Sequence, residues 1–429
     1  MSASPTTGAR DFLLTVLAAG GGGQSLLLLA ARLVARGHRV RILGEEGQRA
    51  AALATGSRFA AWEHLPAHQA RASLSDAQET PIDAREELRR LSVLLGEAAA
   101  GFAAATMHEL DREPAEAVIT LDMLHGVMAL CEAGALPLAV ISASISPFPI
   151  PGVPPFGAGL LPPKTPQDEE HQRVIAREIE EIFDAALPGL NRARRGLGLP
   201  ELAHLADSVK SGIHYLCTAR SFDFAPAVLP RHVCYAGPLL DRSEVAWQSP
   251  WGANDERALV LVAFSTTFQN QVDVLQRVID ACARLPIAVL LTLGSAIAPD
   301  AVKPAANTHI VAHAPHMAVM RRASAVITHG GHGTVMAALV RRLPLLVIPQ
   351  GRDQYDNAVR ITERGAGLAL PPSTTPQQIT AAVTRLLDEP QFKAGAVRLG
   401  DAVALEERDS TLVSEIEALA ASSAVAEQF

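Results

Sequence analysis

The sequence predicts an α/β protein with two doubly wound domains that face one cleft. Apolar, β-branched segments alternate with amphipathic segments along nearly the whole chain, a pattern typical of parallel sheets covered by helices. The alternation pauses at 241–256, a stretch of prolines, glycines and polar residues that we interpret as the interdomain linker between 1–240 and 257–402. A chain of 429 residues, 48% of them hydrophobic, is long enough for two separate cores.

The composition excludes several classes of partner. The formal net charge is −8 at pH 7 and no run of lysine and arginine occurs, which argues against nucleic acid or an anionic membrane surface as a partner. Small molecules are the expected partners. The oligomeric state stays open, with a homodimer as one alternative.

The cysteines and apolar runs indicate a compartment. The four cysteines form no C-x-x-C pair, so neither a zinc site nor a disulfide framework is predicted, and we expect reduced thiols, no metal and no bound cofactor in a cytoplasmic protein. The apolar run at 12–19 could be taken for a signal-peptide core, but only Arg10 precedes it and glycines follow it, so we interpret 12–17 as the first strand. No apolar run approaches the roughly 20 residues that a membrane span needs. The cysteines are Cys131, Cys217, Cys234 and Cys282.

The N-terminal half begins with a β-α-β pattern, with a helix expected at 25–36 and a strand at 40–43. A Gly-x-Gly-x-x-Gly motif fails because position 25 is Ser25, which disfavours an NAD site. Prolines between 147 and 166 predict an irregular surface loop of the kind that lines binding sites. The other expected elements are helical regions at 73–110 and 167–196 and strands at 117–120, 138–141, 213–217 and 233–235.

The C-terminal half repeats the alternation of strands and helices. Strands are expected at 258–264, 287–292, 309–312, 325–328 and 345–348. Helices are expected at 271–284, 335–340, 376–387, 391–401 and 402–421.

A loop of glycines and histidines, HGGHGT at 329–334, joins one of these strands to a helix. Glycines keep Cβ atoms away, so backbone N–H groups and the positive end of the helix can close on an anion such as phosphate. His329 and Thr334 can each donate one hydrogen bond to that anion. The alternative is a purely structural turn; the sequence has no Gly-x-x-x-x-Gly-Lys-Ser/Thr motif, so the loop is not a P-loop.

Asp353 and Gln354 follow the next strand. They are therefore expected at the carboxyl edge of the sheet, where open α/β folds bind ligands. Together with the glycine loop, they suit a phosphate that carries a hydroxyl-rich group.

These residues carry a resemblance to a known family. The stretch from Ala314 to Asn357, APHMAVMRRASAVITHGGHGTVMAALVRRLPLLVIPQGRDQYDN, resembles the donor-binding signature of the family 1 glycosyltransferases, in their bacterial natural-product branch. A weaker similarity extends through VARGHRVRILG near the start and HVCYAGPLLD before the linker. The resemblance implies the GT-B fold, two Rossmann-like domains facing a cleft, with the C-terminal segment 403–429 returning to the first domain.

The resemblance also implies roles for individual residues. His329 and Thr334, with the backbone of Gly331, His332 and Gly333, would hold the diphosphate of a UDP- or TDP-sugar. Asp353 and Gln354 would bind sugar hydroxyls. The base and ribose would lie at His313, Ala314 and His316, although the tryptophan that plant members stack on uracil has no counterpart here. Ser265 and Thr266 would assist at the diphosphate, or else form an ordinary helix cap.

One family feature is missing. The acceptor base of the family is a histidine after the first strand, and Gly22 stands there. We therefore predict that Asp122 is the base, assisted by His125, in an inverting transfer to a small aromatic or polyketide acceptor, including transfer to carbon. Asp122 as a helix N-cap and His125 as a packing residue are the structural alternatives. An O-glycosyltransferase of phenols, a nucleotide-sugar epimerase and a non-catalytic auxiliary protein are the functional ones.

Overall fold

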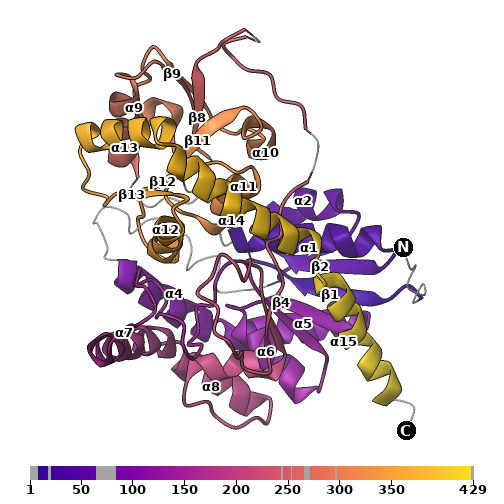
Figure 1. Cartoon of the computed structure of the whole chain (residues 1–429). Helices are drawn as coiled ribbons and strands as arrows, with labels where there is room; N and C mark the ends of the chain where they lie inside the picture. The colour runs from indigo at the N-terminus through magenta and orange to yellow at the C-terminus, as the bar shows by residue number, and fades with distance from the viewer. Residues whose placement is uncertain are drawn as a thin grey trace.

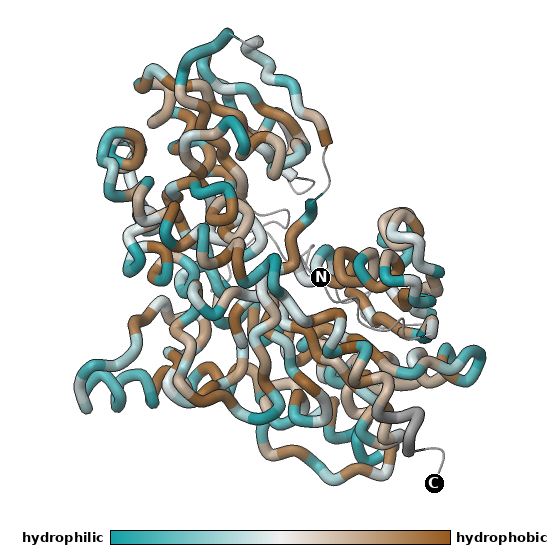
Figure 2. Tube along the Cα trace, turned by 45° about the vertical axis from the view of Figure 1, so that its right-hand side comes forward, coloured by the Kyte–Doolittle hydropathy of each residue, from teal (hydrophilic) through white to brown (hydrophobic). Residues whose placement is uncertain are grey.

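Two parallel sheets organise the chain, one on each side of residues 241–256 (Figure 1). The computed structural model describes residues 8–17, 21–63, 84–242, 245–252, 254–264, 271–294 and 297–426. Figure 2 shows hydrophobic segments in the interior of both lobes and hydrophilic residues toward their periphery. The predicted α/β class with two doubly wound domains is confirmed.

The N-terminal sheet has seven strands in the order β3-β2-β1-β4-β5-β6-β7. The strand order reverses between β1 and β4, which makes their carboxyl ends the expected ligand edge. The strands are β1 (Asp11–Thr15), β2 (Arg39–Gly44), β3 (Arg58–Ala61), β4 (Ala117–Leu121), β5 (Leu138–Ser142), β6 (Ile213–Leu216) and β7 (Val233–Tyr235). The helices are α1 (Gly21–Ala35), η1 (Glu46–Gln48), α2 (Arg49–Ala54), α4 (Ala84–Glu97), α5 (Ala99–Arg112), α6 (His125–Ala133), α7 (Pro166–Asp184), α8 (Leu187–Gly196) and η2 (Leu205–Ser211).

The C-terminal sheet has six strands in the order β10-β9-β8-β11-β12-β13, with its reversal between β8 and β11. Its strands are β8 (Ala258–Ala263), β9 (Ile287–Thr292), β10 (Thr308–Val311), β11 (Ala323–Thr328), β12 (Leu345–Val347) and β13 (Gly367–Ala369). Its helices are α9 (Val272–Cys282), η3 (Pro299–Ala301), α10 (His316–Val319), α11 (His332–Val340), α12 (Gln354–Glu363), α13 (Pro376–Asp388) and α14 (Pro390–Arg408), and the chain ends in α15 (Leu412–Ala426).

The side chains of β8 alternate between two cores. Leu259 and Leu261 pack into the cluster that includes residues of α11 and α14. Val260 and Val262 pack into the cluster that includes residues of α9 and α13. This period of two, with both faces buried, explains why the strand reads as an unbroken apolar run.

Some predicted boundaries are wrong. The first helix begins at Gly21, inside the glycine run, and a Cβ on Gly23 would lie 2.7 Å from the Leu17 carbonyl oxygen. The run therefore forms the first turn of α1, pressed against the end of β1. At the other end of the chain the helix expected to end at 401 continues to Arg408, and the break falls at 409–411, where the Ser410 hydroxyl bonds the Ala236 carbonyl.

Helix α15 crosses back onto the N-terminal domain (Figure 1). Its residues Leu412, Ile416 and Ala420 belong to the hydrophobic core built on β1, β4 and β5. Its Glu417 carboxylate lies 2.6 Å from His38 Nε2 and pairs with Arg36, directly after the first helix. Among the described residues, no single helix is long and apolar enough to span a membrane, and only the bent pair α4 and α5 would together meet that length and hydropathy.

Candidate active site

The loop after β11 brings a helix N-terminus to the reversal point of the C-terminal sheet. Gly330 has φ +96° and a Cβ there would lie 2.8 Å from Val347 Cγ1, so the close turn requires glycine. A Cβ on Gly331 would lie 2.6 Å from His329 Nε2. Gly333 is exposed, with open space where a Cβ would be. The first turn of α11, which includes the half-buried Thr334, therefore offers an accessible backbone at its positive end.

His329 is buried beneath this loop. Its ring lies against Phe264, with 5.9 Å between centroids, and its Nε2 atom faces Gly331. Burial lowers the pKa of His329 to about 4, so the ring is neutral at pH 7. An anionic ligand at the loop would raise that pKa and favour a charged hydrogen bond.

The side chain of His332 points away from the loop. It is buried against Phe222, with 5.7 Å between ring centroids, and its Nδ1 lies 3.4 Å from Asn357 Oδ1. Within the described part of the chain, its Nε2 has no hydrogen-bond partner. Only the backbone of His332 remains available to an anion at the loop.

Asp353 and Gln354 stand at the start of α12, a helix that the sequence analysis did not predict. Asn357, fully buried, donates from Nδ2 to the Gly330 carbonyl at 2.8 Å and to Asp353 Oδ2 at 3.0 Å, so the carboxylate is tied to the glycine loop. Gln354 is only 2% exposed, and its Oε1 accepts a hydrogen bond from the Gln350 backbone at 2.7 Å. Asp353 is the more exposed member of the pair.

The residues predicted for the nucleoside follow β10 at the same sheet edge. His316 opens α10, and its Nε2 lies 3.1 Å from Thr292 Oγ1 at the end of β9. Burial lowers the pKa of His316. His313 is exposed and Ala314 half-buried. Ser265 and Thr266 lie outside the described residues.

Asp122 lies at the carboxyl end of β4, beside the reversal point of the N-terminal sheet. Its carboxylate accepts a hydrogen bond from Ser142 Oγ, and burial raises its pKa to about 6. The N-cap alternative is wrong: α6 is preceded by Leu124 as its cap residue, which makes no side-chain cap bond.

His125 does not join Asp122. Its Nδ1 lies 2.8 Å from Ser208 Oγ on η2, and its ring packs edge-on against Phe148 at 6.1 Å. Burial lowers the pKa of His125 to about 4. These contacts favour the packing alternative over assistance to a base.

Two residues linked to Asp122, Ser142 and His214, were missed by the sequence analysis. Ser142 Oγ, which donates to Asp122, also lies 2.7 Å from His214 Nε2 on β6. Each is a polar residue in an otherwise apolar strand, Ser142 in β5 and His214 in β6, and this could have marked them as candidates. That they lie side by side follows only from the strand order.

A second unforeseen contact joins the two domains. Asp356 on α12, 2% exposed, accepts hydrogen bonds from the backbone N–H groups of Gly157 at 2.5 Å and Gly159 at 2.8 Å. Both glycines have positive φ, 76° and 62°, within the proline-rich loop. This loop is irregular, as predicted. Helix α12, whose N-cap is Asp353, therefore holds the proline-rich loop of the N-terminal domain.

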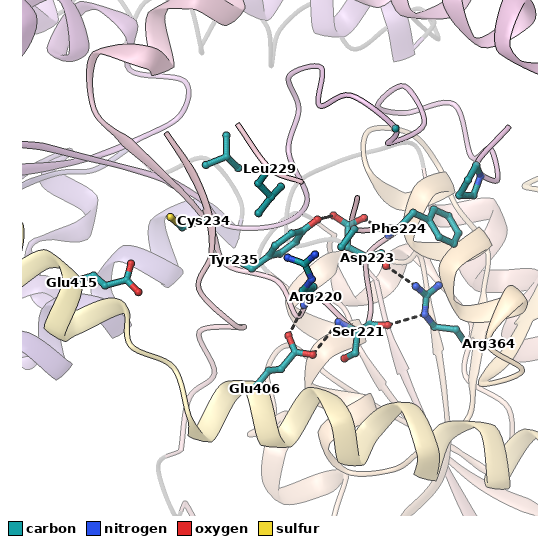
Figure 3. Close-up of a pocket in the computed structure, with 14 residues that line it drawn as sticks. Arg220, Ser221, Asp223, Phe224, Leu229, Cys234, Tyr235, Arg364, Glu406 and Glu415 are labelled. Carbon is teal, nitrogen blue, oxygen red and sulfur yellow. Dashed lines mark hydrogen bonds between the residues drawn. The ribbon is translucent and has the colours of Figure 1, made fainter. Parts of the chain in front are cut away.

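A cavity of about 980 Å³ lies at the domain junction (Figure 3). Its lining includes neither the glycine loop at 329–334 nor Asp122. Figure 3 shows the Glu406 carboxylate of α14 facing the segment at Arg220 and Ser221, and Arg364, directly after α12, reaching the same segment. Asp223, in the same segment, forms a buried ion pair with Arg360 of α12 at 2.7 Å. These contacts fasten the segment between β6 and β7 to the C-terminal domain.

No cluster of His, Cys, Asp and Glu suited to a metal occurs among the residues the structure describes.

Comparisons with known proteins identify similar sequences and folds. Residues 276–419 match the family described as Erythromycin biosynthesis protein CIII-like, C-terminal domain. The chain is 27% identical over 412 residues to 4'-demethylrebeccamycin synthase of Lentzea aerocolonigenes. That alignment covers 91% of this chain and 94% of the synthase. The solved glycotransferase of kitacinnamycin aligns with a TM-score of 0.72 at 19% identity, over 96% of this chain and 99% of its own. The calicheamicin glycosyltransferase aligns with a TM-score of 0.71 at 17% identity, over 96% and 98%. The two-domain fold is therefore shared with these structures over nearly the full length of each.

Proposed function

We propose that this chain, a glycosyltransferase of GT-B fold related to enzymes of bacterial natural-product biosynthesis, moves a sugar from a UDP- or TDP-sugar to a small aromatic or polyketide acceptor. The observation that carries the proposal is the accessible first turn of α11 at the reversal point of the C-terminal sheet, with Asp353 tied to the same loop. A diphosphate fits the positive helix end, and the carboxylate fits the hydroxyls of the attached sugar.

On the donor side, the loop stabilises the leaving group. As the bond between the anomeric carbon and the diphosphate oxygen breaks, its electron pair leaves with the diphosphate. Backbone N–H groups from Gly331 to Thr334 and the ring of His329 offset that growing charge. The nucleoside lies toward His313, Ala314 and His316.

On the acceptor side, Asp122 takes the proton of the attacking group. The new bond forms between the acceptor oxygen or carbon and the anomeric carbon, on the face opposite the diphosphate, so the anomeric configuration inverts. A carboxylate is a weak base, which suits an acidic phenol or an electron-rich aromatic carbon. The glycine that replaces the family's histidine supports transfer to carbon, and transfer to phenolic oxygen is the second candidate.

The test is turnover. The protein is incubated with UDP- and TDP-sugars and a panel of phenolic and polyketide aglycones, and a glycoside is sought by mass spectrometry. The expected product gains one hexosyl or deoxyhexosyl mass, and its survival in hot acid indicates a carbon linkage, whereas hydrolysis indicates an oxygen linkage.

The same experiment separates the alternatives. An epimerase would change the sugar of the donor with no acceptor present. An auxiliary protein would show a nucleotide-dependent rise in melting temperature but yield no product. Either result would contradict glycosyl transfer.

A further inference from the structure

We propose that Ser142 and His214 are positioning residues that hold Asp122 ready to accept the acceptor's proton. The inference rests on the proposed function, since it assumes that Asp122 is the base. It adds a hydrogen-bonded line of side chains, from Asp122 through Ser142 to His214, which we call the base relay.

The base relay crosses three neighbouring strands at their carboxyl ends. β4, β5 and β6 are adjacent and parallel. Ser142, the last residue of β5, pairs with Leu216, two residues beyond His214. Because side chains alternate along a strand, residues two apart share a face, which brings His214 beside Ser142. Both are 1% exposed, so water does not compete for their hydrogen bonds.

Counting hydrogens fixes the direction of the relay. An ionised carboxylate only accepts, so the single hydroxyl hydrogen of Ser142 goes to Asp122. The Ser142 oxygen then accepts from His214, which must carry its hydrogen on Nε2. Burial lowers the pKa of His214 to about 3, so this histidine is neutral at pH 7 and acts as a fixed donor.

The relay engages one of the two carboxylate oxygens. Ser142 donates to Oδ2 of Asp122, and the backbone N–H of Asp122 donates to the Ile141 carbonyl at 3.1 Å, which holds the residue at the end of the strand. In the part of the chain that the structure describes, no other side chain hydrogen-bonds this carboxylate, so Oδ1 is the oxygen that we assign to take the proton.

The relay also opposes the effect of burial. The hydrogen bond from Ser142 lowers the pKa of Asp122, while burial raises it to about 6. The other titratable groups near Asp122 are Cys217 just after β6, whose pKa the carboxylate helps to raise, and the neutral rings of His214 and His125. Among the described residues, no lysine or arginine forms an ion pair with Asp122, so Ser142 is its main stabilising partner.

The chain contains a matched control. His125 and Ser208 form a second buried serine–histidine pair at 2.8 Å in the same domain, and Ser208 donates to the Leu205 carbonyl instead of to a carboxylate. Removing either serine hydroxyl has the same chemical effect, but only Ser142 contacts Asp122.

The experiment records the pH dependence of kcat/KM for the full chain, with a UDP- or TDP-sugar and an acceptor found in the turnover screen. Ser142→Ala should move the acid limb about one pH unit upward, because the pKa of Asp122 rises when its donor is lost, and should lower kcat about tenfold at pH 7. His214→Phe should move it in the same direction by less. His214→Gln, whose amide can replace Nε2–H, should restore the wild-type limb, and Ser208→Ala should leave the profile unchanged.

Two outcomes would overturn the base relay: an unmoved acid limb in Ser142→Ala, or an equal shift in Ser208→Ala. The nucleotide-induced rise in melting temperature, measured for every variant, confirms that each one folds. Asp122→Asn separates this inference from its premise. If that variant is inactive while Ser142→Ala is normal, the relay alone fails; if Asp122→Asn is fully active, the base assignment fails.

Discussion

Each sheet has an edge at the point where its strand order reverses, and the two edges are assembled differently. At the edge that we propose for the donor, the glycine loop at 329–334 and the start of α12 are close in sequence and offer mainly backbone groups and helix ends. At the edge that we propose for the acceptor, Asp122, Ser142 and His214 come from separate strands and offer side chains. A site whose residues are close in sequence can be predicted from a sequence motif. A site whose residues come from separate strands can be recognised only once the strand order is known.

The largest expected effect is at the acceptor edge. Asp122→Asn removes the only group at that edge that we assign as base, so kcat should fall about 100- to 10,000-fold. Donor binding should persist, because the donor edge belongs to the other domain. Steady-state rates measure kcat, and the melting-temperature shift with UDP or TDP measures donor binding. Undiminished turnover would contradict the assignment of Asp122 as the base.

A smaller effect is expected at the donor edge. His329→Ala should weaken nucleotide binding about 10- to 100-fold, the usual loss for one hydrogen bond to a charged group. Gly331→Ala should act in the same direction, since its Cβ would lie 2.6 Å from His329 Nε2. Isothermal titration with UDP and TDP measures both affinities.

The matched control for Gly331→Ala is Gly196→Ala at the end of α8, where a Cβ meets no atom within 4 Å. Its nucleotide affinity should equal that of the wild type. Unaltered affinity in both His329→Ala and Gly331→Ala would argue against a diphosphate at this loop.

A third prediction concerns the contact that bridges the two edges. Asp356→Asn retains one acceptor oxygen for Gly157 and Gly159 and replaces the other with a donor. The proline-rich loop should loosen, and the KM for the acceptor should rise about tenfold, with less change in the KM for the donor.

Asp168→Asn is its control. Asp168 also accepts backbone hydrogen bonds, from Lys164 and Thr165 at the far end of the same loop, but it caps α7 and does not bridge the domains. Its acceptor KM should match the wild-type value. Equal changes in both variants would show that general loop stability, not the bridge, sets acceptor binding.

The smallest predicted effect is on stability. Because burial raises the pKa of both Asp122 and Asp356 to about 6, above the ordinary value of 3.8, the folded state binds more protons than the unfolded state between pH 4 and 6. These two groups therefore lower the free energy of unfolding as pH rises through that window. Asp122→Asn should flatten the decline and be about 1 kcal/mol more stable than the wild type at pH 7.

Asp168 should behave with the opposite sign. The hydrogen bond from Thr165 lowers its pKa, so its contribution to stability is present at neutral pH and is lost as pH falls through that lowered pKa. Melting temperatures of the wild type, Asp122→Asn and Asp168→Asn at pH 5 and pH 7.5 measure both signs. A lower melting temperature for Asp122→Asn at pH 7.5 would contradict the cost assigned to its burial.

The sequence predicted more of the proposed donor edge than of the proposed acceptor edge. Regular alternation predicted the strands of both sheets except the edge strands β3 and β13, and the HGGHGT loop predicted a strand, turn and helix that the structure contains. It did not predict that His332 turns inward, because loop composition does not specify side-chain direction. Nor did it predict Ser142, His214 or the grip of Asp356 on the proline-rich loop, since these depend on strand order and on the contact of one domain with the other.

The final helix has a consequence for biosynthesis. Leu412, Ile416 and Ala420 of α15 fill part of the core formed by strands synthesised near the start of the chain. An N-terminal domain emerging from the ribosome therefore carries an apolar gap until residues 412–420 have been made. A fragment that ends at the linker would lack these side chains. We expect it to need a separately supplied peptide of residues 410–426 to complete its hydrophobic core.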